Sequence, residues 1–134
     1  RYRTGDLTTL NYDECECGRT MVRMDNVTGR ADDLLIVRGV NLYPSEIEHV
    51  VLDIEGVAPH YRIDLHREGS LDVMELTVEM EEGATQSRQS LEAEILERLE
   101  NVLQFTPDEL DLVEPGGVAR SEVGKVQRVY DHRE

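Results

Sequence analysis

The sequence predicts an α+β fold in which a small mixed sheet, largely antiparallel, carries two main helices on one face. Residues 47–54 and 91–103 repeat apolar side chains every three or four positions, which is typical of amphipathic helices. Residues 61–66 and 74–81 instead alternate apolar and polar side chains, as half-buried strands do. A chain of 134 residues can bury roughly two thirds of its unfolded surface, so it can build one modest core.

The first predicted elements are a strand and a helix. Residues 34–37 form a short apolar run that predicts a buried strand, followed by a loop through Asn41. Pro44 suits the first turn of a helix, because its missing amide hydrogen is not needed there. This helix is expected to stop at Gly56, and its apolar face consists of Ile47, Val50, Val51 and Ile54.

A hairpin and a second helix follow. The turn Glu68-Gly69-Ser70 separates the two alternating stretches, which predicts a hairpin with one buried face. The second helix is expected to end before Thr106-Pro107, because proline cannot continue a helix. Its apolar positions are Leu91, Ile95, Leu99, Val102 and Leu103.

The end of the chain is expected to be a strand and a loop. Residues 110–113 predict a strand that ends at residues 115–117, and the loop after it holds Lys125. Residues 1 to about 30 are polar and rich in turns, so we expect short strands whose sheet partners are missing. Alone, this segment would be disordered or would pair with another copy, as in a homodimer.

The composition is strongly acidic. The chain has 29 acidic residues against 14 basic ones and a net charge of −15, which disfavours nucleic-acid and anionic-membrane partners. Such acidity, with arginine replacing lysine, predicts a halophilic host. The sequence shows neither an 18-residue apolar run nor a leader and starts at Arg1, so we expect a cytoplasmic fragment of a longer protein.

The only two cysteines, Cys15 and Cys17, lie too close together for an easy disulfide. They supply half of the four ligands that a structural zinc site needs, and the four histidines are scattered. We therefore expect no complete zinc site within this chain. Two readings stay open: a metal half-site completed elsewhere, and a turn with two reduced thiols.

The single lysine, Lys125, stands among thirteen arginines. An ammonium is a compact point charge on a flexible stem, whereas a guanidinium is a planar fork. Lys125 is therefore either a chance surface residue or a retained chemical group. It follows Gly124 in a segment that begins at Ala119-Arg120-Ser121.

Three segments together resemble the adenylate-forming acyl-CoA ligases. They are Tyr2-Arg3-Thr4-Gly5-Asp6, the run from Gly29 to Glu48, and Gly124-Lys125, and they occur in the family's order. Arg38-Gly39-Val40-Asn41-Leu42-Tyr43-Pro44-Ser45-Glu46-Ile47-Glu48 and Cys17-Gly18-Arg19-Thr20 are most similar to the phenylacetate-CoA ligase branch. The resemblance implies that residues 1–32 are the last strip of the N-terminal adenylation domain plus a hinge, and residues 33–134 the C-terminal lid domain.

The resemblance also implies roles for individual residues. Asp6 would hold the ribose hydroxyls of the nucleotide, Arg30 would lie beside that nucleotide, and Asp32 would be the hinge. Lys125 would bridge the substrate carboxylate and the α-phosphate during adenylation. For Asp6 and Asp32, a solvated acidic turn is the alternative reading, and Ala119 departs from the proline usual before Arg-Ser/Thr, which puts the order of that loop in doubt.

The second half-reaction would use another loop. After lid rotation, Arg38, Gly39 and Val40 would line the tunnel for coenzyme A, where a residue without Cβ permits close backbone approach. A simple strand-end glycine is the alternative for Gly39. The family implies a small carboxylic acid such as an arylacetate, ATP with Mg²⁺, CoA as co-substrate, and the missing N-terminal domain as partners. The isolated fragment should be inactive, because the phosphate cradle and the acyl pocket are absent from it.

Two other functions stay open. A deazaflavin-coenzyme adenylating synthetase would need Lys125 but no thiol tunnel. A small-ligand or interaction module would need neither. These alternatives differ in what they require of Gly39 and Lys125.

Overall fold

The computed structural model describes residues 2–120 and 126–133, and the chain divides into two compact units. Unit 1 is Arg1–Leu34 and unit 2 is Leu35–Glu134. Within the described residues, no helix is long and apolar enough to cross a membrane.

Unit 1 consists of two short antiparallel strand pairs. Strand β1 pairs with β4, and β2 pairs with β3. The elements are β1 (Asp6–Leu7), β2 (Leu10–Asn11), β3 (Arg23–Met24), β4 (Gly29–Arg30) and a 3₁₀ helix (Ala31–Asp33). Short strands were predicted here, and they pair with one another within the unit. That further sheet partners belong to a missing domain stays a prediction. The turns between the strands bring them back onto one another as nested hairpins.

Unit 1 lacks a core of its own. All the buried hydrophobic residues among the described positions come from Leu35 onward. Several large apolar side chains of unit 1 are instead exposed, including Tyr2, Tyr12, Met21, Val22 and Met24. Strand pairs this short make few hydrogen bonds, and a set of exposed apolar side chains is typical of a surface that contacts another part of a protein.

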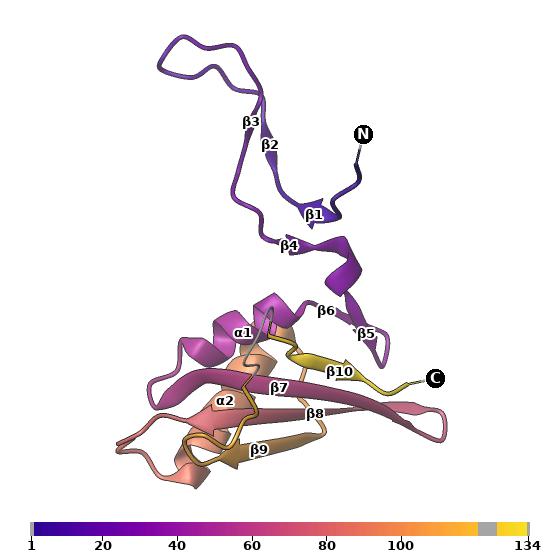
Figure 1. Ribbon diagram of the computed structural model, residues 1–134, viewed down its shortest axis with the longest axis vertical. Coiled ribbons are helices and arrows are strands. Elements are labelled where there is room, and N and C mark those ends of the chain that lie inside the picture. Colours follow the sequence, from indigo (N-terminus) through magenta and orange to yellow (C-terminus); the bar gives the residue numbers. More distant parts are fainter. Residues whose placement is uncertain (1, 121–125, 134) are drawn as a thin grey trace. The chain divides into compact units, whose positions relative to one another are not determined.

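Unit 2 contains a hairpin, a four-stranded sheet and two helices (Figure 1). Its elements are β5 (Leu35–Val37), β6 (Val40–Leu42), α1 (Pro44–Leu52), β7 (Val57–Glu68), β8 (Leu71–Met80), α2 (Arg88–Leu103), β9 (Glu109–Val113) and β10 (Val129–Asp131). The prediction of an α+β fold with a mixed sheet is confirmed.

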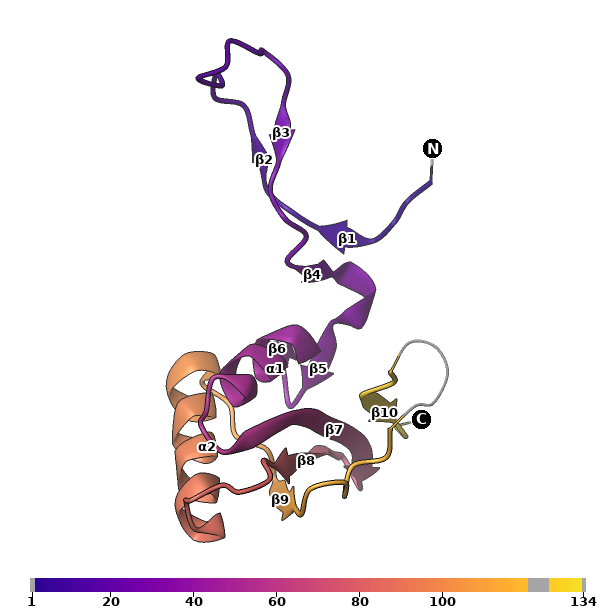
Figure 2. The same cartoon turned by 60° about the vertical axis from the view of Figure 1, so that its left-hand side comes forward.

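The four-stranded sheet has the order β10-β7-β8-β9. The central pair, β7 and β8, is antiparallel, while β10 runs parallel to β7 and β9 runs parallel to β8. Both helices pack on the same face of this sheet (Figure 2). The opposite face carries the polar positions of the alternating strands.

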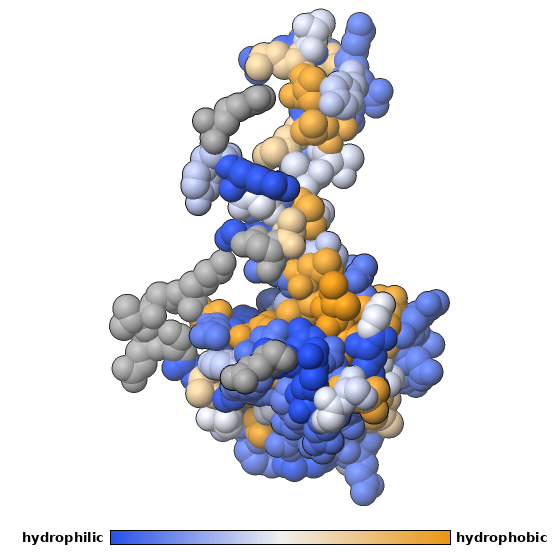
Figure 3. Space-filling view, turned by 90° about the vertical axis from the view of Figure 1, so that its right-hand side faces the viewer, coloured by the Kyte–Doolittle hydropathy of each residue, from blue (hydrophilic) through white to orange (hydrophobic). Residues whose placement is uncertain are grey.

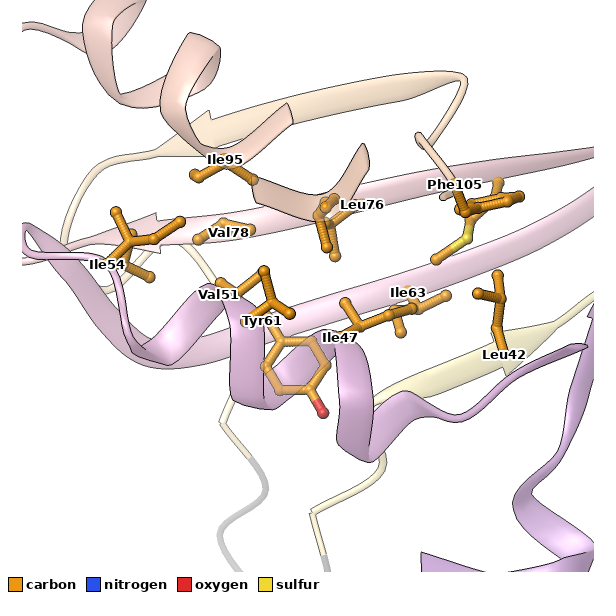
Figure 4. Close-up of a cluster of buried hydrophobic side chains, with 14 of the residues drawn as sticks. Leu42, Ile47, Val51, Ile54, Tyr61, Ile63, Leu76, Val78, Ile95 and Phe105 are labelled. Carbon is orange, nitrogen blue, oxygen red and sulfur yellow. The ribbon is translucent and has the colours of Figure 1, made fainter. Parts of the chain in front are cut away.

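The core lies between the helices and the sheet (Figure 4). Ile63 and Leu65 from β7 and Leu76 and Val78 from β8 are at most 1% exposed. The side chains that cover them come from the hairpin, both helices and the residues just after each helix, and include Leu42, Ile47, Val51, Ile54, Ile95 and Phe105. The apolar faces predicted from periodicity therefore meet in one cluster.

The helix ends follow local chemistry. The amide of Tyr43 donates to the Glu46 carboxylate at 3.3 Å at the start of α1, and Ser87 Oγ accepts from the Ser90 amide at 3.2 Å at the start of α2. Helix α2 ends at Gln104, whose φ of 52° is left-handed. These contacts satisfy amides and carbonyls that have no partner within a helix.

Two strands were not predicted. Residues Val40–Leu42, expected as a loop, form β6, and Val129–Asp131 form β10 at the edge of the sheet. Both strands have only three residues, so neither shows a readable alternation. Their pairing with β5 and β7 comes from the tertiary structure.

Candidate functional site

Asp6 and Arg30 lie directly opposite each other in unit 1. They are paired residues of the antiparallel strands β1 and β4. Arg30 Nη2 also donates to the Thr4 carbonyl at 3.3 Å, and Asp6 is exposed. The two residues expected beside the nucleotide are therefore neighbours, although 24 positions separate them in the chain.

Asp32 lies in the 3₁₀ helix Ala31–Asp33, which joins β4 to the start of unit 2. The flanking residues Arg30 and Leu34 are both extended, with φ of −124° and −64°. A single turn between two extended residues can change direction through a few backbone angles. This position is consistent with a hinge.

Arg38 and Gly39 form the two-residue turn of the β5–β6 hairpin, since Val37 pairs with Val40. Both turn residues have positive φ, 52° and 80°, as a type I′ turn requires. Glycine adopts this conformation without strain, whereas arginine does not. A Cβ added to Gly39 would meet nothing within 4 Å in the described residues.

The Arg38 side chain contacts three residues that follow helix α2. Its Nη1 lies 3.0 Å from Asp108 Oδ1, and its Nη2 donates to the Thr106 carbonyl at 2.8 Å. The guanidinium also lies 4.8 Å from the centre of the Phe105 ring. Asp108 Oδ2 accepts the Met74 amide at 2.9 Å, which ties the hairpin turn to β8.

Lys125 lies outside the described residues. The described segments on either side of it line one pocket of about 250 Å³ with residues 118–120, 126–128 and Tyr130, together with β7 residues 60–62. The pocket is bordered by basic and aromatic side chains, including Arg62, whose guanidinium lies 4.1 Å from the centre of the Tyr130 ring.

Glu79 anchors the segment that leads toward Lys125. Its side chain is 2% exposed, although it lies on the polar face of β8. Glu79 Oε1 accepts the Gly116 amide at 2.8 Å and Arg120 Nη2 at 2.9 Å, and Oε2 accepts the Val118 amide at 3.3 Å. Burial would raise the pKa of Glu79, but the two amides and Arg120 outweigh it and hold this pKa below its ordinary value.

A tight turn brings this segment to Glu79. Gly117 N donates to the Glu114 carbonyl at 2.8 Å, and Gly116 has φ of 86°, as the third residue of a type II turn requires. Pro115 suits the second position of that turn. A Cβ on Gly117 would come within 2.7 Å of Val113 Cβ, so this position tolerates no side chain without movement.

Arg128 anchors the chain where it returns. The Arg128 carbonyl accepts the Ile63 amide at 2.8 Å, and its guanidinium lies 4.6 Å from the centre of the Tyr61 ring. Arg128 Nη1 lies 3.4 Å from Glu48 Oε1, and Tyr61 Oη donates to Glu48 Oε2 at 2.9 Å. Burial and the hydrogen bond to Glu48 raise the pKa of Tyr61, so this hydroxyl stays protonated.

Cys15 and Cys17 are free thiols in unit 1, and Cys17 Sγ donates to Cys15 Sγ at 2.9 Å. The Cys15 thiol and the Arg19 amide lower the pKa of Cys17 below its ordinary value, because each can donate a hydrogen bond to the Cys17 thiolate. No group of three or more metal-binding side chains occurs among the described residues. The two thiols thus meet, but the further ligands of a zinc site are not beside them in that part of the chain.

The comparison with known proteins identifies the family. The family described as "AMP-binding enzyme C-terminal domain" matches residues 39–133. This chain belongs to that family. The AMP-binding enzyme C-terminal domain thus includes nearly all of unit 2, while unit 1 precedes the matched region.

Relatives of this AMP-binding enzyme C-terminal domain include ligases. Phenylacetate-coenzyme A ligase from Thermus thermophilus is 45% identical over 148 positions, covering 99% of this chain and 33% of the relative. The enzyme of the same name from Escherichia coli is 38% identical, covering 99% of this chain and 30% of the relative. The chain therefore spans about a third of the length of these relatives.

Two solved structures of ligases are similar to this chain in fold and in sequence. A crystal structure of 2-hydroxyisobutyryl-CoA ligase in the postadenylation state has a TM-score of 0.77 and 35% identity, covering 96% of this chain and 28% of that chain. A domain of phenylacetate-coenzyme A ligase from Bacteroides vulgatus has a TM-score of 0.65 and 33% identity, covering 77% of this chain and 95% of that chain.

Sequence reasoning missed Glu79 and Asp108. Glu79 alternates with apolar residues, as a solvent-facing residue of β8 would, and its partners lie 37 to 41 positions away. Asp108 follows Pro107 and resembles a turn residue. The one sequence feature that points toward the Glu79 contacts is Pro115-Gly116, which is typical of a turn and indicates that the chain changes direction there.

Proposed function

We propose that this chain is the C-terminal part of an ATP-dependent, AMP-forming carboxylate-CoA ligase of the phenylacetate-CoA ligase kind. The observation that carries this proposal is the 45% identity to the Thermus thermophilus enzyme over 99% of the chain, which includes both units. Asp6, Arg30 and Asp32 in unit 1 and Lys125 in unit 2 are its expected functional residues. An arylacetate is the proposed substrate class.

The first half-reaction would form an acyl-adenylate. A carboxylate oxygen attacks the α-phosphorus of ATP, and the bond to pyrophosphate breaks. Asp6 would accept hydrogen bonds from the ribose hydroxyls, and Arg30 on the paired strand would lie beside the nucleotide. Lys125 would stabilise the charge that builds on the phosphoryl oxygens, while Mg²⁺ would accompany the ATP.

The second half-reaction would form the thioester. The thiol of CoA loses its proton, its sulfur attacks the acyl carbon, and the bond to AMP breaks. The exposed hairpin turn Arg38-Gly39 supports this role, because it presents backbone without a Cβ at its tip. Val40 starts the strand after the turn, and Asp32 would be the hinge that exchanges the two loops.

The test uses the full-length ligase with a panel of carboxylic acids. AMP release and CoA consumption are followed together, and we expect both to depend on an arylacetate. Lys125→Ala should abolish most pyrophosphate release, and Lys125→Arg should not restore it, because a planar fork cannot replace a point charge. Adenylation that is unchanged in Lys125→Ala would leave this chain as an interaction module.

A second variant separates the CoA ligase from an adenylating synthetase without a thiol tunnel. A bulky residue in place of Gly39 should reduce thioester formation in the full-length enzyme and leave adenylate formation intact. The isolated 134-residue chain should release no pyrophosphate with any acid. Turnover by the isolated chain would contradict the two-domain account.

A further inference from the structure

Arg133 connects the β5–β6 hairpin to the four-stranded sheet. Its Nη1 donates to the Ile36 carbonyl of β5 at 2.6 Å and lies 3.0 Å from Asp72 Oδ2 on β8. Its Nε and Nη2 donate to the two oxygens of Asp131 on β10, at 2.9 Å and 2.8 Å. One guanidinium therefore joins β5, β8 and β10, although Arg133 and Ile36 are 97 positions apart in the sequence.

We propose that Arg133, together with Asp72, is a positioning residue for the thioesterification half-reaction. This inference rests on the proposed function, in which the Arg38-Gly39 turn of the hairpin lines the tunnel for CoA. Neither Arg133 nor Asp72 is expected to touch CoA or the acyl group. They act by restricting the hairpin that carries the turn.

The hairpin depends on contacts outside itself, because its own hydrogen bonds are few. Strands β5 and β6 have three residues each and pair with one another in a two-stranded sheet. An isolated hairpin of two strands is marginally stable in water. Val37 and Leu42 are buried in the core, but apolar burial is not directional. A hydrogen bond to the strand is directional, so it restricts the position of the hairpin further.

The register of the hairpin leaves the Ile36 carbonyl available for this contact. Val37 pairs with Val40 across the two-residue turn, and this pair is the hydrogen-bonded one. Ile36 pairs with Asn41, one position further from the turn. Hydrogen-bonded and non-hydrogen-bonded pairs alternate in an antiparallel ladder, so the backbone groups of Ile36 point away from β6. Arg133 therefore contacts the outer edge of β5, close to the turn.

The contact is largely buried, and its charges are paired. The side chains of Arg133 and Asp72 are 15% and 16% exposed. Asp72 Oδ1 also accepts from Arg67 Nε at 2.9 Å, so this carboxylate retains a partner when Arg133 is replaced. The planar guanidinium of Arg133 makes four contacts at once, with Ile36, Asp72 and both oxygens of Asp131. A lysine has three donors on a flexible stem and cannot reproduce this arrangement.

The test measures the two half-reactions separately in the full-length ligase. Adenylation is measured as pyrophosphate release without CoA, using the acid that gives the most AMP in the panel. Thioesterification is measured from added acyl-adenylate over a range of CoA concentrations, which gives kcat and KM. Arg133→Gln is the first variant. Asp72→Asn is the second, because it weakens the contact from the other side and keeps the Arg133 side chain.

We expect Arg133→Gln to lower kcat/KM for CoA by about 10-fold, the factor typical for a lost hydrogen bond from a charged group. The loss should appear mainly as a raised KM, because the turn would bind CoA and would not react with it. Adenylation should stay within about 2-fold of wild type. Asp72→Asn should show the same pattern more weakly, and Arg133→Lys should lose less than Arg133→Gln.

Arg67→Gln is the matched control. It removes the other arginine that contacts Asp72, and it should leave both half-reactions unchanged. Hydrogen exchange then separates positioning from direct contact with CoA. The amides of residues 35–42 should exchange faster in Arg133→Gln and Asp72→Asn than in the wild type or in Arg67→Gln.

Three outcomes would overturn the inference and leave the proposed function standing. They are equal losses in both half-reactions, no loss in thioesterification, and a loss in thioesterification without faster exchange of the hairpin, which would mean that Arg133 touches CoA itself. Asp72→Asn decides by the same criteria if Arg133→Gln does not fold. A wild-type enzyme that forms no thioester with any acid of the panel would instead overturn the proposed function.

Discussion

Glu79 Oε1 lies 2.9 Å from Arg120 Nη2, and the two residues are 41 positions apart. The carboxylate is 2% exposed, whereas the Arg120 side chain is 58% exposed. One buried acceptor thus holds a surface arginine and two backbone amides. Removing the Glu79 carboxylate is costly, because the Val118 amide, at a buried position, loses its acceptor.

Glu79 should make the free energy of unfolding of unit 2 depend on pH. Its folded pKa lies below its unfolded value of about 4.3. The stabilisation is therefore present above that unfolded value and is lost as pH falls through the folded pKa. Glu79→Gln should lower the melting temperature at pH 7 and flatten its fall between about pH 5 and pH 3. Thermal melts at several pH values test this, and the same slope in variant and wild type would contradict it.

Gly39→Ala should destabilise the chain by about 1 kcal/mol, because φ of 80° is unfavourable for a residue with a Cβ. There is room for the added methyl group, so the loss comes from the backbone alone. Asn41→Ala, at an exposed position of the adjacent strand, is the control. Urea unfolding of the two variants separates the effects, and equal midpoints would show that the turn relaxes without strain.

Leu76→Ala should destabilise unit 2 by about 2–5 kcal/mol, the range for a buried leucine on a central strand. Leu76 is 1% exposed and lies between the sheet and the helices (Figure 4). Leu71→Ala on the same strand is the control, since Leu71 is 64% exposed. Chemical denaturation gives both free energies, and a loss below about 1 kcal/mol at Leu76 would mean that the core repacks around the cavity.

Cys17 should react with iodoacetamide at a lower pH than an ordinary thiol, because the Cys15 hydrogen bond lowers its pKa. Cys15→Ser weakens that interaction and should move the midpoint of the rate profile to higher pH. Mass spectrometry of the alkylated peptide measures the rate at each pH. An unchanged midpoint in Cys15→Ser would show that the thiols do not interact in solution.

Added salt should stabilise the chain. On the face of unit 2 seen in Figure 3, hydrophilic side chains predominate, and the net charge of the chain is −15. Raising KCl from about 0.1 M to 1 M shortens the Debye length from about 10 Å to 3 Å, so the acidic groups repel one another less. The melting temperature should rise over this range, as calorimetry can measure. A fall would contradict the prediction of a halophilic host.

The sequence by itself determined the kinds of element and the faces that they bury. The apolar spacing of Ile47 and Val51 in α1, or of Leu91 and Ile95 in α2, is a local property, so the pattern alone predicts which side meets the core. The motif residues Asp6, Asp32 and Lys125 can be recognised from the sequence, because the short segments that contain them occur in the family's order.

Only the tertiary structure decided which strands pair and which charges meet. Nothing in three residues such as Val129–Asp131 indicates a strand parallel to β7, and nothing near Asp108 points to Arg38, 70 positions away. Glu79 alternates as a surface residue would, and it is buried only because the chain after β9 folds across it. Such hydrogen bonds and ion pairs join residues far apart in the sequence. They form only when the whole fold closes the long loops between them, so no local pattern predicts them.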